Sequence, residues 1–195
     1  MATTTEPPAS PARRLLLRAA AAGAAVLALS AHSPYAQWQA YRRQRLIVAV
    51  DGADDGAVAL GGAVAAALAR DVPESRAMLA RARDLNDLVR LLQSAQLDAA
   101  LMRAVDARAA LDGSGPAADG GSVALRALAR FGPYLFVSRA ELPDGIAHEL
   151  AEALNAQRDP IAAVAAVAAT ESAAEPVAIV AVPPHRGAFP HYRGD

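Results

Sequence analysis

The sequence predicts an α/β fold, in which helices surround a short mixed or parallel sheet. Along residues 45–195, short apolar runs of strand length alternate with segments in which leucine and alanine recur at helical spacing. Turn-forming stretches rich in Gly, Pro and Asp separate many of them. This alternation favours strands that lie side by side under a cover of helices. Ligands of such sheets bind beyond the carboxyl ends of the strands.

The first strand is expected at residues 45–50, because RLIVAV is short, apolar and followed by the turn sequence DGADDG. A helix is expected over 59–72, ending at the break before Pro73. Asp84 is the expected N-cap of the next helix. The other expected elements are strands at 75–82, 97–104, 124–131, 134–140 and 176–183, helices at 84–96, 105–113, 143–157 and 159–170, and a flexible loop at 113–122.

Residues 1–31 resemble an export segment, and they predict an N-terminal hydrophobic helix ahead of the sheet. The basic cluster Arg13, Arg14 and Arg18 precedes an apolar run that is as long as the hydrophobic part of a signal peptide. The segment is either a cleaved signal, with a loose twin-arginine match, or an uncleaved inner-membrane anchor. A buried amphipathic helix of the domain is the third interpretation. Residues 32–44 are the expected linker, and residues 45–195 the domain.

Composition excludes several classes of function. The formal net charge of −1 argues against a nucleic-acid partner, which would need a basic surface. Residues 46–195 alone carry 13 basic and 19 acidic groups, a formal charge of −6. There is no cysteine, which excludes disulfides, thiolate zinc sites and a cysteine nucleophile. No serine lies in a nucleophile elbow, so we predict a protein that is not an enzyme and needs no cofactor.

Five stretches of the chain, in this order, resemble the TAXI-type solute-binding subunits of TRAP transporters. The resemblance is carried by LIVAVDGADDGAVALGGAVAAAL (46–68), DLNDLVRLLQSAQLDAALMRAVDARAALDG (84–113), LRALARFGPYLFVSRAE (125–141), LPDGIAHELAEALNAQ (142–157) and VPPHRGAFPHYRG (182–194). It covers roughly residues 46–194. His185, Gly187, Ala188 and Tyr192 match the end of such proteins.

The resemblance also has a large gap. Family members have a second lobe, whereas Glu141 here leads almost directly into the helix expected at Pro143. The implied fold is therefore a single-lobed layer like that of type II periplasmic binding proteins. Val58 and Ala59 replace the paired tyrosines of the family, and Arg83-Asp84 replaces its Gly-Ser turn. The groups that would contact a ligand are thus the most altered.

Six residues are the candidate ligand-binding set. The turn after the first strand could present backbone N–H groups to a ligand, although its aspartates would repel an anion. Its carboxylates could instead hold a cation, but the turn lacks the full spacing of a calcium loop, and an ordinary solvated turn is the favoured interpretation. Arg83 and Arg103 are expected at the mouths of two strands and could each bind a carboxylate, or could pair with Asp84 and Asp106 at the surface. The candidates are Gly52, Asp55, Gly56, Arg83, Asn86 and Arg103.

We predict no metal site, because zinc usually needs three or four protein ligands. His185 and His191 lie close together in sequence, and His148 is the only other histidine in the expected domain. The resemblance implies an exported periplasmic protein that weakly binds a small organic anion, a dicarboxylate or an amino acid, for membrane transporter subunits. The alternative is a periplasmic scaffold or accessory module that has lost its ligand.

Overall fold

A five-stranded mixed sheet lies at the centre of the computed structural model, which describes residues 45–115, 118–171 and 182–191. The strand order is β2-β1-β3-β5-β4. Three strands are parallel neighbours, whereas β5 runs antiparallel to both β3 and β4. The strands are β1 (Ile47–Asp51), β2 (Met78–Ala82), β3 (Ala99–Arg103), β4 (Leu125–Phe131) and β5 (Tyr134–Arg139).

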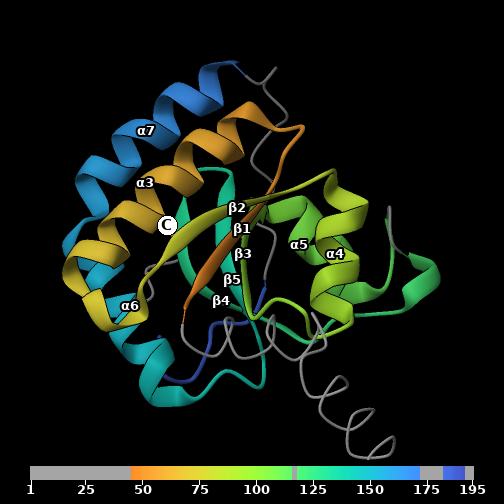
Figure 1. Ribbon diagram of the computed structural model, residues 1–195. Helices are drawn as coiled ribbons and strands as arrows, with labels where there is room; N and C mark the ends of the chain where they lie inside the picture. Colours follow the sequence, from red (N-terminus) through yellow and green to blue (C-terminus); the bar gives the residue numbers. More distant parts are fainter. Residues whose placement is uncertain (1–44, 116–117, 172–181, 192–195) are drawn as a thin grey trace, which may run out of the picture. The chain divides into compact units, whose positions relative to one another are not determined.

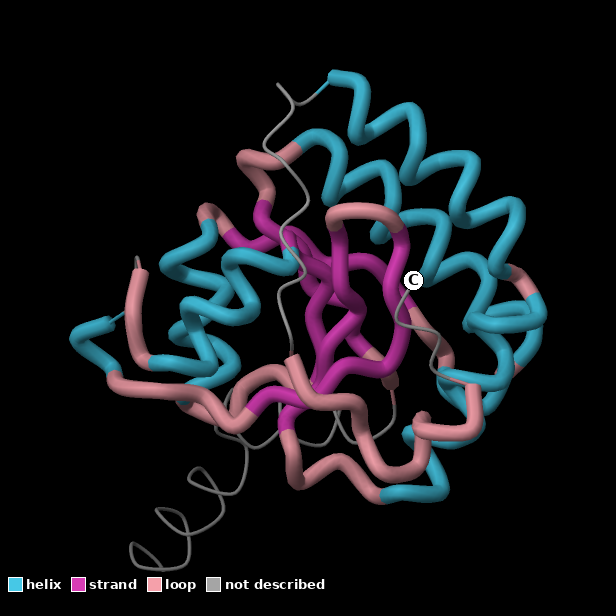
Figure 2. Tube along the Cα trace, turned by 180° about the vertical axis from the view of Figure 1, so that it is seen from behind, coloured by secondary structure: helices cyan, strands magenta, loops and turns pink. Residues whose placement is uncertain are grey.

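Helices cover both faces of this sheet, and Figure 1 shows them as two groups on opposite sides. One group comprises α3 (Asp55–Asp71), α6 (Asp144–Ala156) and α7 (Arg158–Glu171). The other comprises α4 (Leu85–Gln93) and α5 (Ala104–Asp112). Two short 3₁₀ turns, η1 (Pro73–Ser75) and η2 (Ala118–Gly120), complete the described elements. The view from behind in Figure 2 shows the same three layers.

Burial on both faces explains why the strands are apolar throughout. Val48 and Val50 of β1 pack into the core under α3, α6 and α7, whereas Ile47 and Ala49 pack into the core under α4 and α5. Successive residues of a strand point to opposite faces, so a sheet covered on both faces needs apolar residues at every position. The continuous run LIVAV therefore has the composition of an inner strand.

Helix α3 lies close to the sheet because a glycine faces it. A Cβ atom on Gly61 would lie 2.5 Å from Val50 Cγ1 and 3.0 Å from Leu79 Cδ1. The helix begins after Asp54, whose side chain accepts a hydrogen bond from the Ala57 backbone N–H. This cap explains why α3 starts at Asp55, four residues before the helix expected at 59–72.

Strand β1 lies where the order of the strands reverses, because the next two strands of the chain are added on opposite sides of it. From β1 the chain crosses through α3 to β2 on one side, and then through α4 to β3 on the other side of β1. The segments that follow β1 and β3 therefore turn toward opposite faces. In open α/β sheets, this is the position at which a crevice forms.

Most elements expected from sequence are present, with shifted ends. The strand expected at 75–82 starts only at Met78, because Pro73–Ser75 forms a 3₁₀ turn. Asp84 is the N-cap of α4, as expected, and accepts a hydrogen bond from the Asp87 N–H. The mixed sheet flanked by helices confirms the α/β class. The expected N-terminal hydrophobic helix, the linker at 32–44 and most of the strand at 176–183 lie outside the described residues.

Residues 182–191 lie beside β4, and they are held there by backbone and histidine contacts. Ala127 N–H donates to Pro183 O at 3.0 Å, and His185 N–H donates to Ala127 O at 2.9 Å. The His185 ring is buried, with one nitrogen against Leu142 O at 3.0 Å and the other accepting from Gly187 N–H at 3.2 Å. His185 therefore has a structural role, joining this segment to the start of α6.

Within the described part of the chain, no helix is long and apolar enough to cross a membrane.

Candidate functional site

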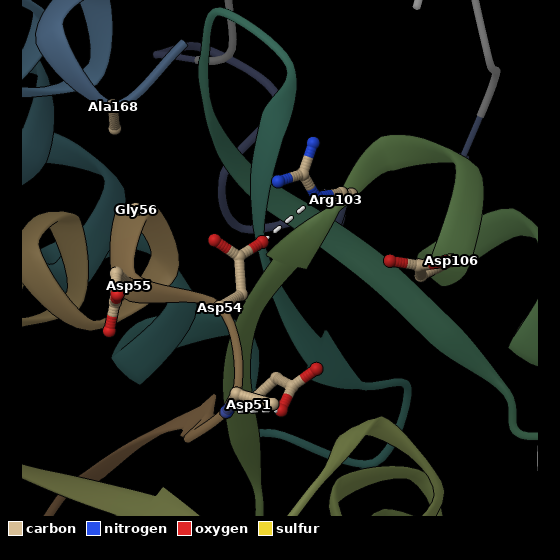
Figure 3. A pocket seen from close by; sticks show the side chains of 8 residues that line it. Asp51, Asp54, Asp55, Gly56, Arg103, Asp106 and Ala168 are labelled. Atoms are coloured by element: carbon tan, nitrogen blue, oxygen red, sulfur yellow. Dashed lines mark hydrogen bonds and ion pairs between the residues drawn. The ribbon is translucent and has the colours of Figure 1, made fainter. Parts of the chain in front are cut away.

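An open depression of about 390 Å³ lies where β1 and β3 end. One wall is the turn after β1, the opposite wall is the junction of β3 and α5, and a residue of α7 closes a third side. This is the crevice position described above for the reversal of the chain. Figure 3 shows the labelled side chains arranged around the opening. The lining residues are Asp51, Ala53, Asp54, Asp55, Gly56, Arg103, Asp106 and Ala168.

Asp54 is the centre of the hydrogen bonds in this depression. Its carboxylate accepts from the Ala57 N–H at 3.0 Å, from Arg103 Nε at 2.8 Å and from the Tyr134 hydroxyl at 3.0 Å. The Asp54 side chain is only 15% exposed, so its charge is stabilised by these donors more than by water. One carboxylate thus caps α3 and ties it to the ends of β3 and β5.

Tyr134 enters this network from β5, at the same end of the sheet as Arg103. Antiparallel register places Tyr134 of β5 directly beside Arg103 of β3. Burial, followed by the negative charge and hydrogen bond of Asp54, raises the pKa of the Tyr134 hydroxyl to about 12. The hydroxyl therefore remains a proton donor to Asp54 across the neutral range.

The Arg103 guanidinium donates a hydrogen bond to Asp54 through Nε and also lines the depression. Burial alone lowers its pKa, but the hydrogen bond and charge of Asp54 outweigh this effect and raise the pKa of the guanidinium overall. Its side chain is 31% exposed, and its Cζ lies 5.4 Å from the centre of the Tyr134 ring. Among the described residues, its N–H groups donate to Asp54 alone, from Nε at 2.8 Å. Figure 3 shows one of the two outer guanidinium nitrogens pointing away from Asp54.

The depression is acidic overall, with four carboxylates and one guanidinium in its lining. Asp51 uses one oxygen to accept from the Ala53 N–H at 2.8 Å, which fixes the turn. Asp55 is exposed in the first turn of α3, and Asp106 lies in the first turn of α5. Because carboxylates outnumber the guanidinium, the lining favours a ligand that carries a positive group as well as a single negative group.

Three of the six candidates predicted from sequence line this depression: Asp55, Gly56 and Arg103. Gly56 is needed there, because a Cβ on it would lie 2.5 Å from the Tyr134 hydroxyl and 3.1 Å from the Ala168 Cβ. Gly52 belongs to the same turn but is not part of the lining. Its N–H donates to Ala82 O at 3.0 Å, and that carbonyl leaves no room for a side chain.

Arg83 and Asn86 lie elsewhere, at the end of β2 and in the first turn of α4. The Arg83 side chain is 80% exposed and pairs with Asp84 at 3.2 Å, the surface arrangement that the sequence left open. The hydrogen bond from the Asp87 N–H is the main cause that lowers the pKa of Asp84; burial opposes it, and the hydrogen bond and charge of Arg83 add to the lowering. Asn86 Oδ1 is buried without a hydrogen-bond partner among the described residues. The depression thus faces β3 and not the loop after β2.

Sequence reasoning did not select Asp54, Tyr134, Asp51 or Asp106 as site residues. Asp54 and Tyr134 are 80 positions apart, and no local pattern links them. One signal could have pointed to Tyr134. It begins a strand directly after a Gly-Pro turn, and pairing that strand with β3 would have placed Tyr134 at the end of β3. Their contact depends on which strands become neighbours.

In residues 45–115, 118–171 and 182–191, no group of three or more His, Cys, Asp or Glu side chains is placed to hold a metal ion. The carboxylates of the depression are therefore not arranged as a cation cage.

Comparisons with known proteins identify no relative of this chain: no protein-family model, no curated protein and no solved structure matches it.

Proposed function

We propose that the protein binds a small amino acid in the depression at the ends of β1 and β3. The carrying observation is the location of that depression at the reversal of the sheet, with Arg103 and the first turn of α3 on facing walls. Arg103 on one wall and the acidic first turn of α3 on the other would bind different ends of a small ligand, and so would fix its orientation.

The charges of the lining select between the two ligand classes that the sequence left open. A dicarboxylate would bring two negative charges against four carboxylates and a single guanidinium. An amino acid could place its carboxylate on the outer N–H groups of Arg103 and its ammonium beside Asp55 or Asp51. Electrostatic complementarity therefore favours the amino acid.

Affinity is expected to be weak. The depression is open to solvent on one side, whereas two-lobed binding proteins close around a ligand and remove it from water. The resemblance to TAXI-type subunits supports the further proposal that this chain is a single-lobed exported relative that works in the periplasm. It would deliver its ligand to membrane transporter subunits and carry out no chemical reaction.

A second function is favoured by the hydrogen bonds of Asp54. This carboxylate already satisfies Arg103, Tyr134 and the cap of α3 without any ligand. A periplasmic scaffold that kept the fold and lost the ligand would have the same network. The two functions differ in whether the depression has an occupant.

Calorimetric titration of the full chain with amino acids and with dicarboxylates separates these functions. Binding of an amino acid with Arg103 as its anchor predicts that Arg103→Gln weakens it about 10- to 100-fold, the effect of losing a charged hydrogen bond. Asp55→Asn should weaken it as well, without touching the Asp54 network. Arg83→Gln is the matched control, since Arg83 lies outside the depression, and it should bind like the wild type. Absence of heat with every compound would favour the scaffold.

A further inference from the structure

Two histidines outside the depression lie ring against ring, although they are 43 positions apart in sequence. His148 is in α6, and His191 is in the C-terminal segment that packs on the start of that helix. Their ring centres are 4.7 Å apart, with the ring planes tilted by 55°. Among the described residues no hydrogen bond joins the two rings, which pack against each other as tilted aromatic rings.

The proton arrangement of His148 leaves one ring nitrogen available. Its Nδ1 lies 3.3 Å from the Gly187 carbonyl oxygen, which can only accept a hydrogen bond. Nδ1 must therefore carry the proton for this contact, and the Nε2 of the neutral ring has a lone pair. Metal-binding histidines are typically held in this way, with one ring N–H on a backbone carbonyl and the other nitrogen on the metal.

His191 contributes a second available nitrogen. Its Nε2 is buried and has no hydrogen-bond partner among the described residues. A buried polar atom without a partner is uncommon and needs a physical explanation, such as a bound ion. The neighbouring backbone is well fixed, because His191 N–H donates to Ala188 O at 2.9 Å.

We infer that His148 and His191 form a two-histidine site for a divalent transition-metal ion of the Zn²⁺ or Cu²⁺ type. Imidazole nitrogens suit these ions, whereas Mg²⁺ and Ca²⁺ prefer oxygen ligands. Water or a further small ligand would complete the coordination, since no third protein ligand is in place among the described residues. The bound ion would join the C-terminal segment to α6, next to the contact that buried His185 already makes.

His185 does not take part in this site. Both of its ring nitrogens are engaged, with Leu142 O and with Gly187 N–H. The sequence analysis predicted no metal site, and the pair inferred here is brought together by the packing of the C-terminal segment on α6.

The test is direct titration of the full chain, without an affinity tag, with Zn²⁺ and in parallel with Cu²⁺ and Mg²⁺. We expect one Zn²⁺ per chain, tighter binding of Cu²⁺ according to the usual order of divalent metals, and no uptake of Mg²⁺. His148→Ala and His191→Ala should each abolish Zn²⁺ uptake. His32→Ala removes a histidine outside the described residues and should leave uptake unchanged.

Thermal unfolding distinguishes loss of the site from loss of the fold. His148 is exposed, so His148→Ala should unfold at the wild-type temperature when metal is absent, and Zn²⁺ should raise that temperature only in the wild type and in His32→Ala. The inference is wrong if neither Zn²⁺ nor Cu²⁺ binds. It is equally wrong if uptake persists in His148→Ala or in His191→Ala.

Discussion

The Tyr134 hydroxyl donates a hydrogen bond to the Asp54 carboxylate at 3.0 Å, across 80 positions of sequence. This contact joins the start of β5 to the N-cap of α3, and Arg103 at the end of β3 joins the same carboxylate at 2.8 Å. Three elements that are separate in sequence thus meet at a single acidic side chain, and that side chain shapes the floor of the depression.

Asp54→Asn should be strongly destabilising. The change removes the negative charge that partners Arg103 and weakens the bond from Tyr134, whereas an asparagine side chain can still cap α3. We expect a loss of about 2 to 4 kcal/mol in the free energy of unfolding, somewhat below the cost of breaking a fully buried ion pair, because Arg103 is partly exposed. Denaturant unfolding measures it. Asp55→Asn is the control, and its exposed side chain should change stability by less than about 1 kcal/mol.

Gly56→Ala should be destabilising although it adds a methyl group to a helix. The new Cβ would lie 2.5 Å from the Tyr134 hydroxyl and 3.1 Å from Ala168. We expect a cost of about 1 to 3 kcal/mol from this overpacking. In the same helix, Gly62 has open space around it, so Gly62→Ala should instead stabilise by about 0.5 to 1 kcal/mol. Equal effects of the two changes would contradict the packing described here.

Stability should fall in the alkaline range because of Tyr134. Its pKa is raised to about 12 in the folded state, whereas an unfolded tyrosine titrates near its usual value of about 10. The folded state therefore holds this proton more tightly, and the corresponding stability is complete below pH about 10 and is lost as pH rises toward about 12. Melting temperature against pH measures it. Tyr134→Phe should flatten the curve over this window, and an unchanged slope would argue against a buried donor.

Gly187→Ala should loosen the C-terminal segment. A Cβ at this position would run into the Asp144 carbonyl oxygen and approach the His148 backbone nitrogen to 3.0 Å. We expect faster hydrogen exchange at the His185 N–H and a loss of about 1 to 3 kcal/mol in stability. Gly145→Ala, in α6 with open space around it, is the matched control and should not raise the exchange rate. Unaltered exchange in Gly187→Ala would refute the close approach.

Local patterns predicted the elements of this fold well, since strand and helix signals depend on neighbouring residues. LIVAV, the Asp84 cap and the break at Pro73 were each readable from a few positions. The order of the strands could not be predicted from local patterns. The side of β1 on which the depression lies could therefore not be predicted either. Arg83 directly follows β2 and Arg103 ends β3, yet of these two it is Arg103 that faces the turn after β1.

The site was predictable only where its residues belong to that turn. Asp55 and Gly56 were selected because they open a helix after a strand, which is a local feature. Asp54 and Tyr134 depend on an antiparallel pairing between β3 and β5 that the sequence leaves undetermined. The histidine pair depends in the same way on the C-terminal segment folding back onto α6.

The central claim is that the depression at β1 and β3 holds an amino acid. The most direct measurement is thermal unfolding of the full chain, alone and with a panel of amino acids and dicarboxylates. A ligand at 100 times its dissociation constant should add about 2.7 kcal/mol to the free energy of unfolding. The account predicts that at least one amino acid produces this shift in the wild type and in Arg83→Gln, that Asp55→Asn reduces it, and that dicarboxylates produce none. A cooperative transition that no amino acid moves, or that dicarboxylates alone move, would contradict it.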